Sequence, residues 1–161
     1  MKRLALACAL TCAVAMFPRG ATANDVAPDT LVTLQRDACE QRCAVYRVVI
    51  FADGTVLYEG RHFVRRNSLI KSGVSPETLA RLIDLLESGG FFELDTDYGY
   101  SRAHLCDRMD ADGPAAILSV SSRGRSKTVL HSHRCVGAVS DRLTAFEDAV
   151  DRAVGAVKWI K

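Results

Sequence analysis

The sequence lacks an excess of charge of either sign. Its 161 residues include 21 Lys and Arg against 19 Asp and Glu. Lys2, Arg3 and Arg19 belong to an N-terminal segment that we expect to be cleaved, which leaves 18 basic residues against 19 acidic ones and a net charge of −1. A near-neutral domain gives no electrostatic support for binding to nucleic acid or to an anionic membrane.

The sequence also lacks the short motifs that mark common enzymes. It has no Gly-x-Ser-x-Gly elbow, no His-Glu-x-x-His helix, no phosphate-binding glycine loop and no dinucleotide fingerprint. It has no internal repeat, no low-complexity tract and no second apolar segment long enough to span a membrane. A catalytic triad is defined by geometry, so scattered Ser, His and Asp side chains could still meet in space. The sequence therefore favours a protein that is not an enzyme, with no cofactor, and leaves an enzyme open.

The first feature that is present is an N-terminal segment with the pattern of a secretory signal. Lys2-Arg3 precedes an apolar run over residues 4–17, and Ala21-Thr22-Ala23 offers small side chains to a signal peptidase. The apolar run is too short to remain as a membrane span. We expect residues 1–23 to be a cleavable signal peptide, residues 24–30 a mobile leader and residues 31–161 a single domain, located in the periplasm or secreted.

The alternative is a lipoprotein acylated at Cys8 or Cys12. The apolar stretch before Cys8 has only about four residues, shorter than the seven or more that a signal needs, and the residues before Cys12 match a lipobox less well. We therefore expect no lipid anchor and no transmembrane anchor in the mature chain.

Apolar patterning predicts two β-hairpins. Val45–Phe51 is rich in β-branched and aromatic residues, Asp53-Gly54 follows, and residues 56–58 resume the pattern, which is typical of a hairpin with a type I′ turn. A second hairpin is predicted from residues 117–121 and 128–133, around residues 122–125. Residues 31–34 are predicted as a first short strand, and residues 62–65 are a candidate for one more. The register implied by the type I′ turn gives one face Val49, Phe51, Val56 and Tyr58, and the other face Val48, Ile50 and Leu57.

Two helices are predicted. Ser75-Pro76 supplies an N-cap hydroxyl and a proline at the first helical position, and Gly89-Gly90 ends the helix. A last helix begins at about Ser140, and its apolar stripe consists of Leu143, Phe146, Val150, Ala153, Val154 and Val157. The order of elements predicts an α+β fold, an antiparallel sheet built from two hairpins with two helices packed on one face.

These motifs resemble a family of exported bacterial domains of unknown function. The resemblance rests on Cys39-x-x-x-Cys43-x-x-Tyr46, Asp53-Gly54, Tyr58-x-Gly60, the Ser75-Pro76 helix and Phe91-Phe92-x-Leu94. It covers about residues 31–159. The sequence departs from the usual Cys-x-Gly-x-Cys-Pro-x-Tyr pattern, since it has neither the glycine nor the proline. The resemblance implies one exported domain and no known catalytic residue.

The four cysteines after the signal are expected to form disulfides. Cys39 and Cys43 lie between two strand-like segments, at a spacing and in a context that differ from a thioredoxin-like motif. Cys106 and Cys135 flank the second hairpin, whose ends lie close together. We expect the pairs Cys39–Cys43 and Cys106–Cys135, although four cysteines allow three connectivities.

His131 and His133 would share one strand face and are the candidate metal ligands. With His62 or His104, and with Cys135 if it were reduced, they could bind zinc or copper. No carboxylate is evidently placed to orient either ring. We therefore interpret them as half-exposed strand histidines, whose replacement should cost little stability, and expect no metal.

Two further clusters have ordinary interpretations. Asp107, Asp110 and Asp112-Gly113 resemble a calcium loop but lack the EF-hand order, so an aspartate-capped turn is expected. Arg61, Arg65 and Arg66 could form an anion-binding strip beside His62, whereas charges that protect an edge strand are the usual explanation.

Taken together, the sequence predicts a non-catalytic binding module for an unknown protein, peptide or envelope ligand, held on a sheet face or edge. The alternative is a small metal-dependent or hydrolytic enzyme centred on His131 and His133, with Asp107 or Asp110.

Overall fold

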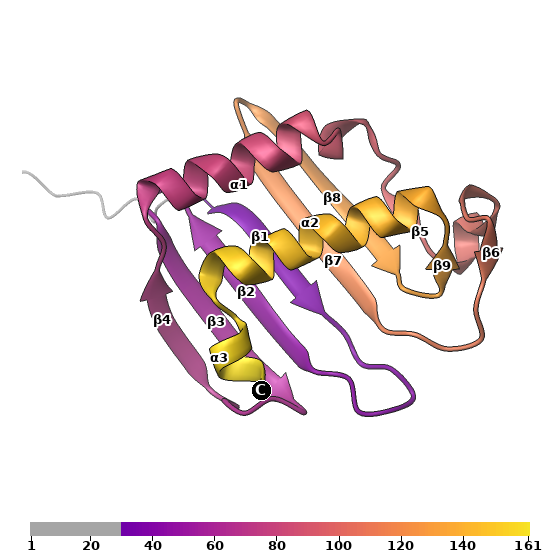
Figure 1. Cartoon of the computed structure of the whole chain (residues 1–161), viewed down its shortest axis with the longest axis horizontal. Coiled ribbons are helices and arrows are strands. Elements are labelled where there is room, and N and C mark those ends of the chain that lie inside the picture. The colour runs from indigo at the N-terminus through magenta and orange to yellow at the C-terminus, as the bar shows by residue number, and fades with distance from the viewer. Residues whose placement is uncertain (1–29) are drawn as a thin grey trace, which may run out of the picture.

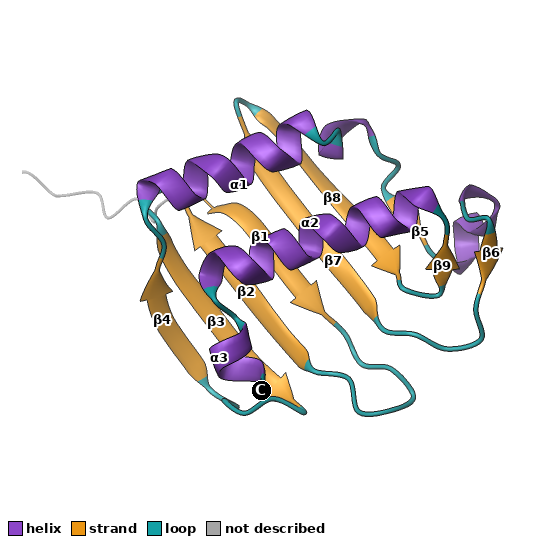
Figure 2. Cartoon of the chain, viewed as in Figure 1, coloured by secondary structure: helices purple, strands orange, loops and turns teal. Residues whose placement is uncertain are grey.

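The computed structural model describes residues 30–161, so the predicted signal peptide and most of the leader lie outside the described residues. One large sheet has the strand order β4-β3-β2-β1-β7-β8-β5, and helices α1 and α2 cross the same face of it (Figures 1 and 2). This is the predicted α+β fold. The strands are β1 (Thr30–Arg36), β2 (Val45–Phe51), β3 (Thr55–His62), β4 (Leu69–Gly73), β5 (Asp97–Tyr98), β6 (Arg108–Met109), β7 (Ala115–Ser122), β8 (Arg125–Ser132) and β9 (Cys135–Val136). The α-helices are α1 (Pro76–Ser88), α2 (Ala138–Val154) and α3 (Val157–Ile160), and 3₁₀ turns span Phe91–Glu93 and Tyr100–Leu105.

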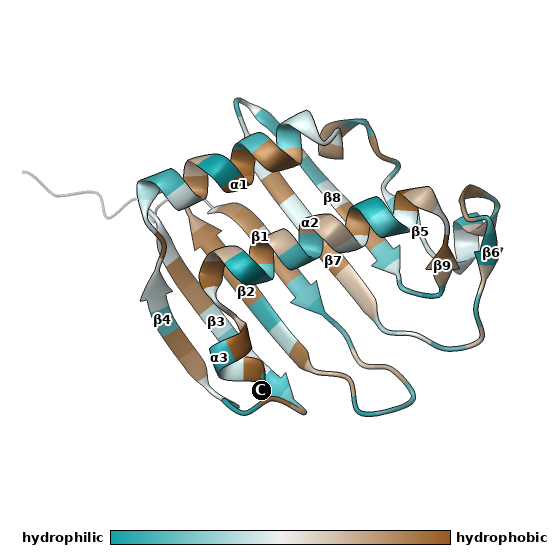
Figure 3. Ribbon diagram, in the orientation of Figure 1, coloured by the Kyte–Doolittle hydropathy of each residue, from teal (hydrophilic) through white to brown (hydrophobic). Residues whose placement is uncertain are grey.

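The sheet is antiparallel except where β5 runs parallel to β8, and β6 pairs with β9 in a separate two-stranded ribbon. Apolar and polar residues alternate along the central strands (Figure 3). Because side chains point to opposite faces in turn, one face becomes apolar and packs under the helices. Its buried residues include Val32, Leu34, Val48, Ile50, Val56, Tyr58, Leu118, Val120 and Val129.

The predicted register of the first hairpin is wrong. Val49 pairs with Leu57, so Val48 and Ile50 share the buried face with Tyr58 and Val56, their cross-strand partners. The connection has three residues instead of two, and Gly54 takes a positive φ of 80° while its N–H donates to the carbonyl of Phe51. Since side chains alternate, one extra loop residue exchanges the faces of a whole strand.

The second hairpin follows its prediction, with a two-residue turn at Arg123-Gly124, both in positive φ. The strand suggested for residues 62–65 is wrong. Strand β3 ends at His62, Phe63 takes a positive φ of 52°, and the next strand is β4. The short strands β5, β6 and β9 have no pattern long enough to be seen in the sequence.

Helix α1 has the predicted ends: the Ser75 hydroxyl accepts a hydrogen bond from the Thr78 N–H, and the helix ends before Gly89. Helix α2 begins at Ala138, two residues before the predicted start, and ends at Val154, after which Gly155 takes a left-handed conformation. Val157 therefore lies beyond α2 and is 61% exposed, so its place in the predicted stripe is wrong. None of the helices in the described part of the chain has the length and apolar content needed to cross a membrane.

Both predicted disulfides are present. Cys39 is bonded to Cys43 in the loop before β2, and Cys106 is bonded to Cys135, which fastens the segment after the second 3₁₀ turn to β9. The second bridge lies next to the end of β8, where the histidines are found.

Candidate functional site

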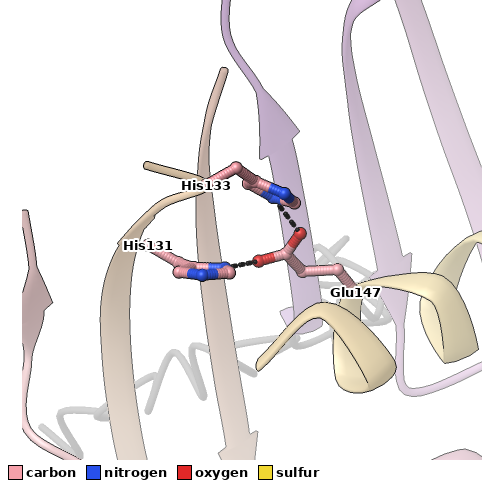
Figure 4. A group of neighbouring side chains, drawn as sticks. All are labelled: His131, His133 and Glu147. Atoms are coloured by element: carbon pink, nitrogen blue, oxygen red, sulfur yellow. Dashed lines mark hydrogen bonds and ion pairs between the residues drawn. The ribbon is translucent and has the colours of Figure 1, made fainter. Parts of the chain in front are cut away.

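A buried carboxylate connects the two histidines of the sequence motif. His131 lies on β8, His133 follows the end of that strand, and Glu147 projects toward both from α2 (Figure 4). His131 Nδ1 is 2.6 Å from Glu147 Oε1, and His133 Nε2 is 2.8 Å from Glu147 Oε2. The two imidazole rings are 4.5 Å apart between centroids. The pair is thus joined through one carboxylate that belongs to the helix above the sheet.

Ser140, in the first turn of α2, completes the surroundings of His131. Its hydroxyl oxygen lies 2.8 Å from His131 Nε2, so both ring nitrogens of His131 have a partner. The hydrogen bonds run from Ser140 to His131 and from His131 to Glu147, as they run from serine to histidine to the acidic residue in the triad of a serine hydrolase. In contrast to such a site, all three residues are buried: Ser140 is 7% exposed, His131 1% and Glu147 0%.

Arg36, at the end of β1, extends the network along α2. Its guanidinium is 2.9 Å from Glu147 Oε2 and 2.8 Å from Asp151 Oδ2, and it also reaches Asp148 at 3.2 Å. The Tyr46 hydroxyl donates to the same oxygen of Asp151 at 2.7 Å. Strands β1, β2 and β8 are therefore all connected to one helix by charged or polar groups.

These contacts shift the pKa values of the network. Burial acts to raise the pKa of Glu147, but the hydrogen bonds and charges of His131 and His133 outweigh it and lower the pKa to about 2. Burial raises the pKa of Asp151, although Arg36 opposes this rise. Burial, together with the negative charge of Asp151, raises the pKa of the Tyr46 hydroxyl. Burial alone would lower the pKa of Arg36, but Asp151 and its other partners raise it, so Arg36 stays charged.

The interpretation of His131 as a half-exposed strand histidine is wrong, as is the statement that no carboxylate orients the rings. Glu147 was not predicted as a site residue, because the interpretation of the last helix rested on its apolar residues alone. A usable signal was present: Glu147 falls four residues after Leu143, on the stripe that faces the sheet. A charged residue on a buried stripe requires a partner, and His131 and His133 were available.

The other predicted ligands lie elsewhere. Within residues 30–161, His131, His133 and Glu147 form the one group of three close metal-ligating side chains, and neither His62 nor His104 belongs to it. Cys135 is in a disulfide and offers no thiolate.

The aspartates and arginines of the other two clusters have local roles. Asp110 pairs with Arg108, and Asp112 accepts a hydrogen bond from the Gly113 N–H, which fits an aspartate-capped turn. Asp107 lies against Gly137. Arg61 pairs with Glu59 on its own strand. The backbone N–H groups of Arg65 and Arg66 bond to carbonyls of α3, which docks that helix on the sheet.

An open groove lies at the opposite end of β8 from His131. It has a volume of about 390 Å³ and runs between α1 and the turns at Gly54 and Arg123. Its lining includes Leu31, Leu79, Ala80 and Ile83, with Asp53, Asp84 and Arg123 as charged groups. Arg123 is within 3.6 Å of Asp84 and within 3.1 Å of Glu87. The carboxylates thus outnumber the single guanidinium at the rim.

Comparison with known proteins gives a family and no function. Residues 30–154 match the model of DUF6438, a domain of unknown function. No curated protein and no solved structure matches the chain. The match covers nearly all of the described domain.

Proposed function

Because the chain belongs to the DUF6438 family, whose function is unknown, we infer its function from its own structure. We propose that it is an exported, non-catalytic module that binds a peptide segment in the groove beside α1. The observation that carries this proposal is the groove itself, where an apolar floor is open and charged groups stand at its rim. Ligand sites in proteins typically combine these two features.

The charges at the groove indicate which peptide fits. Asp53 and Asp84 line the groove together with one guanidinium, that of Arg123, which is already paired with Asp84 and Glu87. An apolar side chain on the floor, next to a Lys or Arg of the same peptide, complements this arrangement better than an acidic neighbour does. A volume of about 390 Å³ has room for one or two apolar side chains.

A dye-displacement experiment tests this proposal. The neutral dye Nile red should bind the mature protein and gain fluorescence, and the peptide acetyl-Leu-Lys-Leu-Lys-amide should displace it at lower concentration than acetyl-Leu-Glu-Leu-Glu-amide. The variant Ala80→Trp fills the groove and should abolish dye binding. The control Arg81→Trp places the same side chain at the next helix position, outside the groove lining, and should leave it unchanged. Equal dye binding in wild type and Ala80→Trp would refute the groove as the site.

A second candidate function is a small hydrolytic or metal-dependent enzyme centred on His131 and His133. The hydrogen bonds that join Ser140, His131 and Glu147 favour it. The burial of these three residues opposes it, since a substrate carbonyl must reach the serine oxygen. A fluorophosphonate probe decides between the two. We expect no labelling of Ser140, and stoichiometric labelling that is lost in Ser140→Ala would make the enzyme the better function.

We also propose that the domain is exported after cleavage at Ala23, into the periplasm or the medium. Two disulfides in one small domain support this, because disulfides are rare in reducing compartments. Intact-mass analysis of the protein from the producing cell should give a chain that begins at Asn24 and is lighter than its reduced form by four hydrogen atoms. A chain that begins at Cys8 or Cys12 with added acyl mass would replace this proposal with a lipoprotein.

A further inference from the structure

Three side chains of the buried network have the composition of a metal site. One ligand atom each from His131, His133 and Glu147 lies within 4.8 Å of the other two. We propose that these residues bind a zinc ion, with His131 Nδ1, His133 Nε2 and the Glu147 carboxylate as ligands. Two imidazoles and one carboxylate are a ligand set that zinc takes in proteins. This inference does not rest on the groove, and it requires no catalysis.

The surroundings hold two of the three ligands, His131 and Glu147, in place. Metal-ligating histidines usually bond through their second ring nitrogen to a neighbour, which fixes the ring. Ser140 has this relation to His131, since its hydroxyl is 2.8 Å from Nε2. Arg36 does the same for the carboxylate at 2.9 Å. These partners come from β1 and from the first turn of α2, so His131 and Glu147 are oriented by packed elements.

The charge of the site favours a divalent cation. With neutral imidazoles, Glu147, Asp148 and Asp151 carry three negative charges against the one positive charge of Arg36, which contacts all three. A zinc ion would compensate the remaining two charges. The His133 side chain is 21% exposed, whereas that of Glu147 is fully buried, so the ion would enter beside His133.

Zinc binding requires a defined movement of protons. In the metal-free protein, His131 donates from Nδ1 and His133 from Nε2 to the carboxylate oxygens of Glu147. A ligating nitrogen needs its lone pair, so each neutral ring must take the other tautomer. His131 would then carry its proton on Nε2 and donate to Ser140, whose hydroxyl can accept as well as donate. No proton leaves the protein in this exchange when both rings are neutral.

The test uses the mature, disulfide-bonded protein, freed of metal with EDTA and titrated with zinc sulfate at pH 7.5. Calorimetry should show one zinc per chain, and long-range ¹H–¹⁵N spectra should show both histidine rings changing tautomer. His133→Ala should remove the stoichiometric binding, and Ser140→Ala should weaken it by about tenfold, as is usual for a group that only orients a ligand. The double variant His62→Ala, His104→Ala removes two imidazoles outside the site and should bind zinc as the wild type does.

Several outcomes overturn the inference. These are no saturable zinc binding, equal loss in the control double variant, or zinc binding without a tautomer change at His131 and His133. The spectra are recorded on the wild type, so this part of the test does not depend on a variant that folds. Loss of zinc binding in His133→Ala leaves the Nile red experiment unaffected, and the two proposals therefore fail separately.

Discussion

Glu147 is the residue whose environment departs most from that of an ordinary surface carboxylate. Its side chain is fully buried, and its two oxygens interact with His131, His133 and Arg36. Removal of one member of a buried charged network usually lowers the stability by more than the whole network contributes to it. The reason is that the remaining charged groups stay buried without a partner. The two histidines therefore depend on this one carboxylate, whereas Arg36 also has Asp148 and Asp151 as partners.

We predict that Glu147→Gln lowers the free energy of unfolding by about 3 kcal/mol, since the amide keeps the shape but not the charge. Urea denaturation of the metal-free protein measures this loss. The matched control is Glu59→Gln, which makes the same change in an ion pair with Arg61 whose side chains are more than 40% exposed. Exposed pairs contribute at most about 1 kcal/mol. A loss in Glu147→Gln no larger than in the control would contradict the network.

His131→Ala should also be destabilising, by about 2 kcal/mol or more, because the ring is buried and both nitrogens are bonded. This reverses the expectation from the sequence, which treated the side chain as half exposed. The same urea measurement applies, and His104→Ala is a suitable control, since His104 is exposed and lies outside the network. Indistinguishable unfolding curves for the two variants would restore the sequence-based expectation.

The metal-free protein should lose stability in acid through Glu147. Its pKa is about 2 in the folded protein against an ordinary 4.5, so the folded state favours the charged carboxylate. A lowered folded pKa stabilises the protein fully above about pH 4.5, and this contribution is lost as the pH falls toward 2. The shift corresponds to about 3 kcal/mol.

Urea unfolding at pH 7, 4.5 and 2.5 checks this dependence. The stability difference between wild type and Glu147→Gln should be present at pH 4.5 and should shrink as the pH falls toward 2.5. A difference that stays the same down to pH 2.5 would show that the charge of Glu147 is not the cause. Glu59→Gln provides the baseline at each pH.

The packing of α2 against α1 decides how the two helices cover the sheet. Phe146 on α2 is 3% exposed, meets Phe91 edge to face at 6.0 Å between centroids, and lies against Gly89 at the end of α1. A Cβ atom at position 89 would lie 2.5 Å from the Phe146 ring. The glycine that ends α1 thus also makes room for the aromatic ring of α2.

Phe146→Ala should therefore cost about 3 to 5 kcal/mol, the usual range for emptying a buried aromatic site. Leu85→Ala on α1 is the control, because Leu85 is 43% exposed and should cost less than about 1 kcal/mol. Chemical denaturation compares the two. If Phe146→Ala cost no more than the control, α2 would not be closing the core.

The elements that the sequence predicted well are those with long patterns and clear ends. Helix α1 has both an N-cap serine and terminal glycines, and the second hairpin has a turn of the expected length. The predicted register of the first hairpin was wrong by a single loop residue, because Asp53-Gly54 fits a two-residue turn as well as the three-residue turn that the structure has. The buried network could not be predicted as a unit, since Arg36, His131 and Glu147 come from three distant segments that meet only when β1 lies near β8 beneath α2.

For the whole molecule, the two disulfides should contribute unequally to stability. Cys106 and Cys135 are 29 residues apart in sequence, whereas Cys39 and Cys43 are 4 apart. In the chain-entropy account, a longer closed loop restricts the unfolded chain more. The stabilisation is about 3.5 kcal/mol for Cys106–Cys135 and about 2 kcal/mol for Cys39–Cys43.

Paired alanine variants measure this difference. Cys106→Ala with Cys135→Ala should lose more stability in urea than Cys39→Ala with Cys43→Ala. The first pair also removes a buried side chain, since Cys135 is 1% exposed, and this adds to its loss. The reverse order of losses would show that the short loop restrains the fold more than its length implies.

The pairing of β1 with β7 at the centre of the sheet also governs when the chain can fold. Val32 lies opposite Val120, and α2, which covers this seam, ends at Val154. Contacts between such distant segments form slowly, because a long stretch of chain must be closed before they gain anything. Helix α1 is synthesised directly after β4, but the part of the sheet face that α2 covers has no partner until the last helix has been made. During synthesis, the polypeptide therefore stays unfolded, and an unfolded chain is the form that passage through a membrane channel would require.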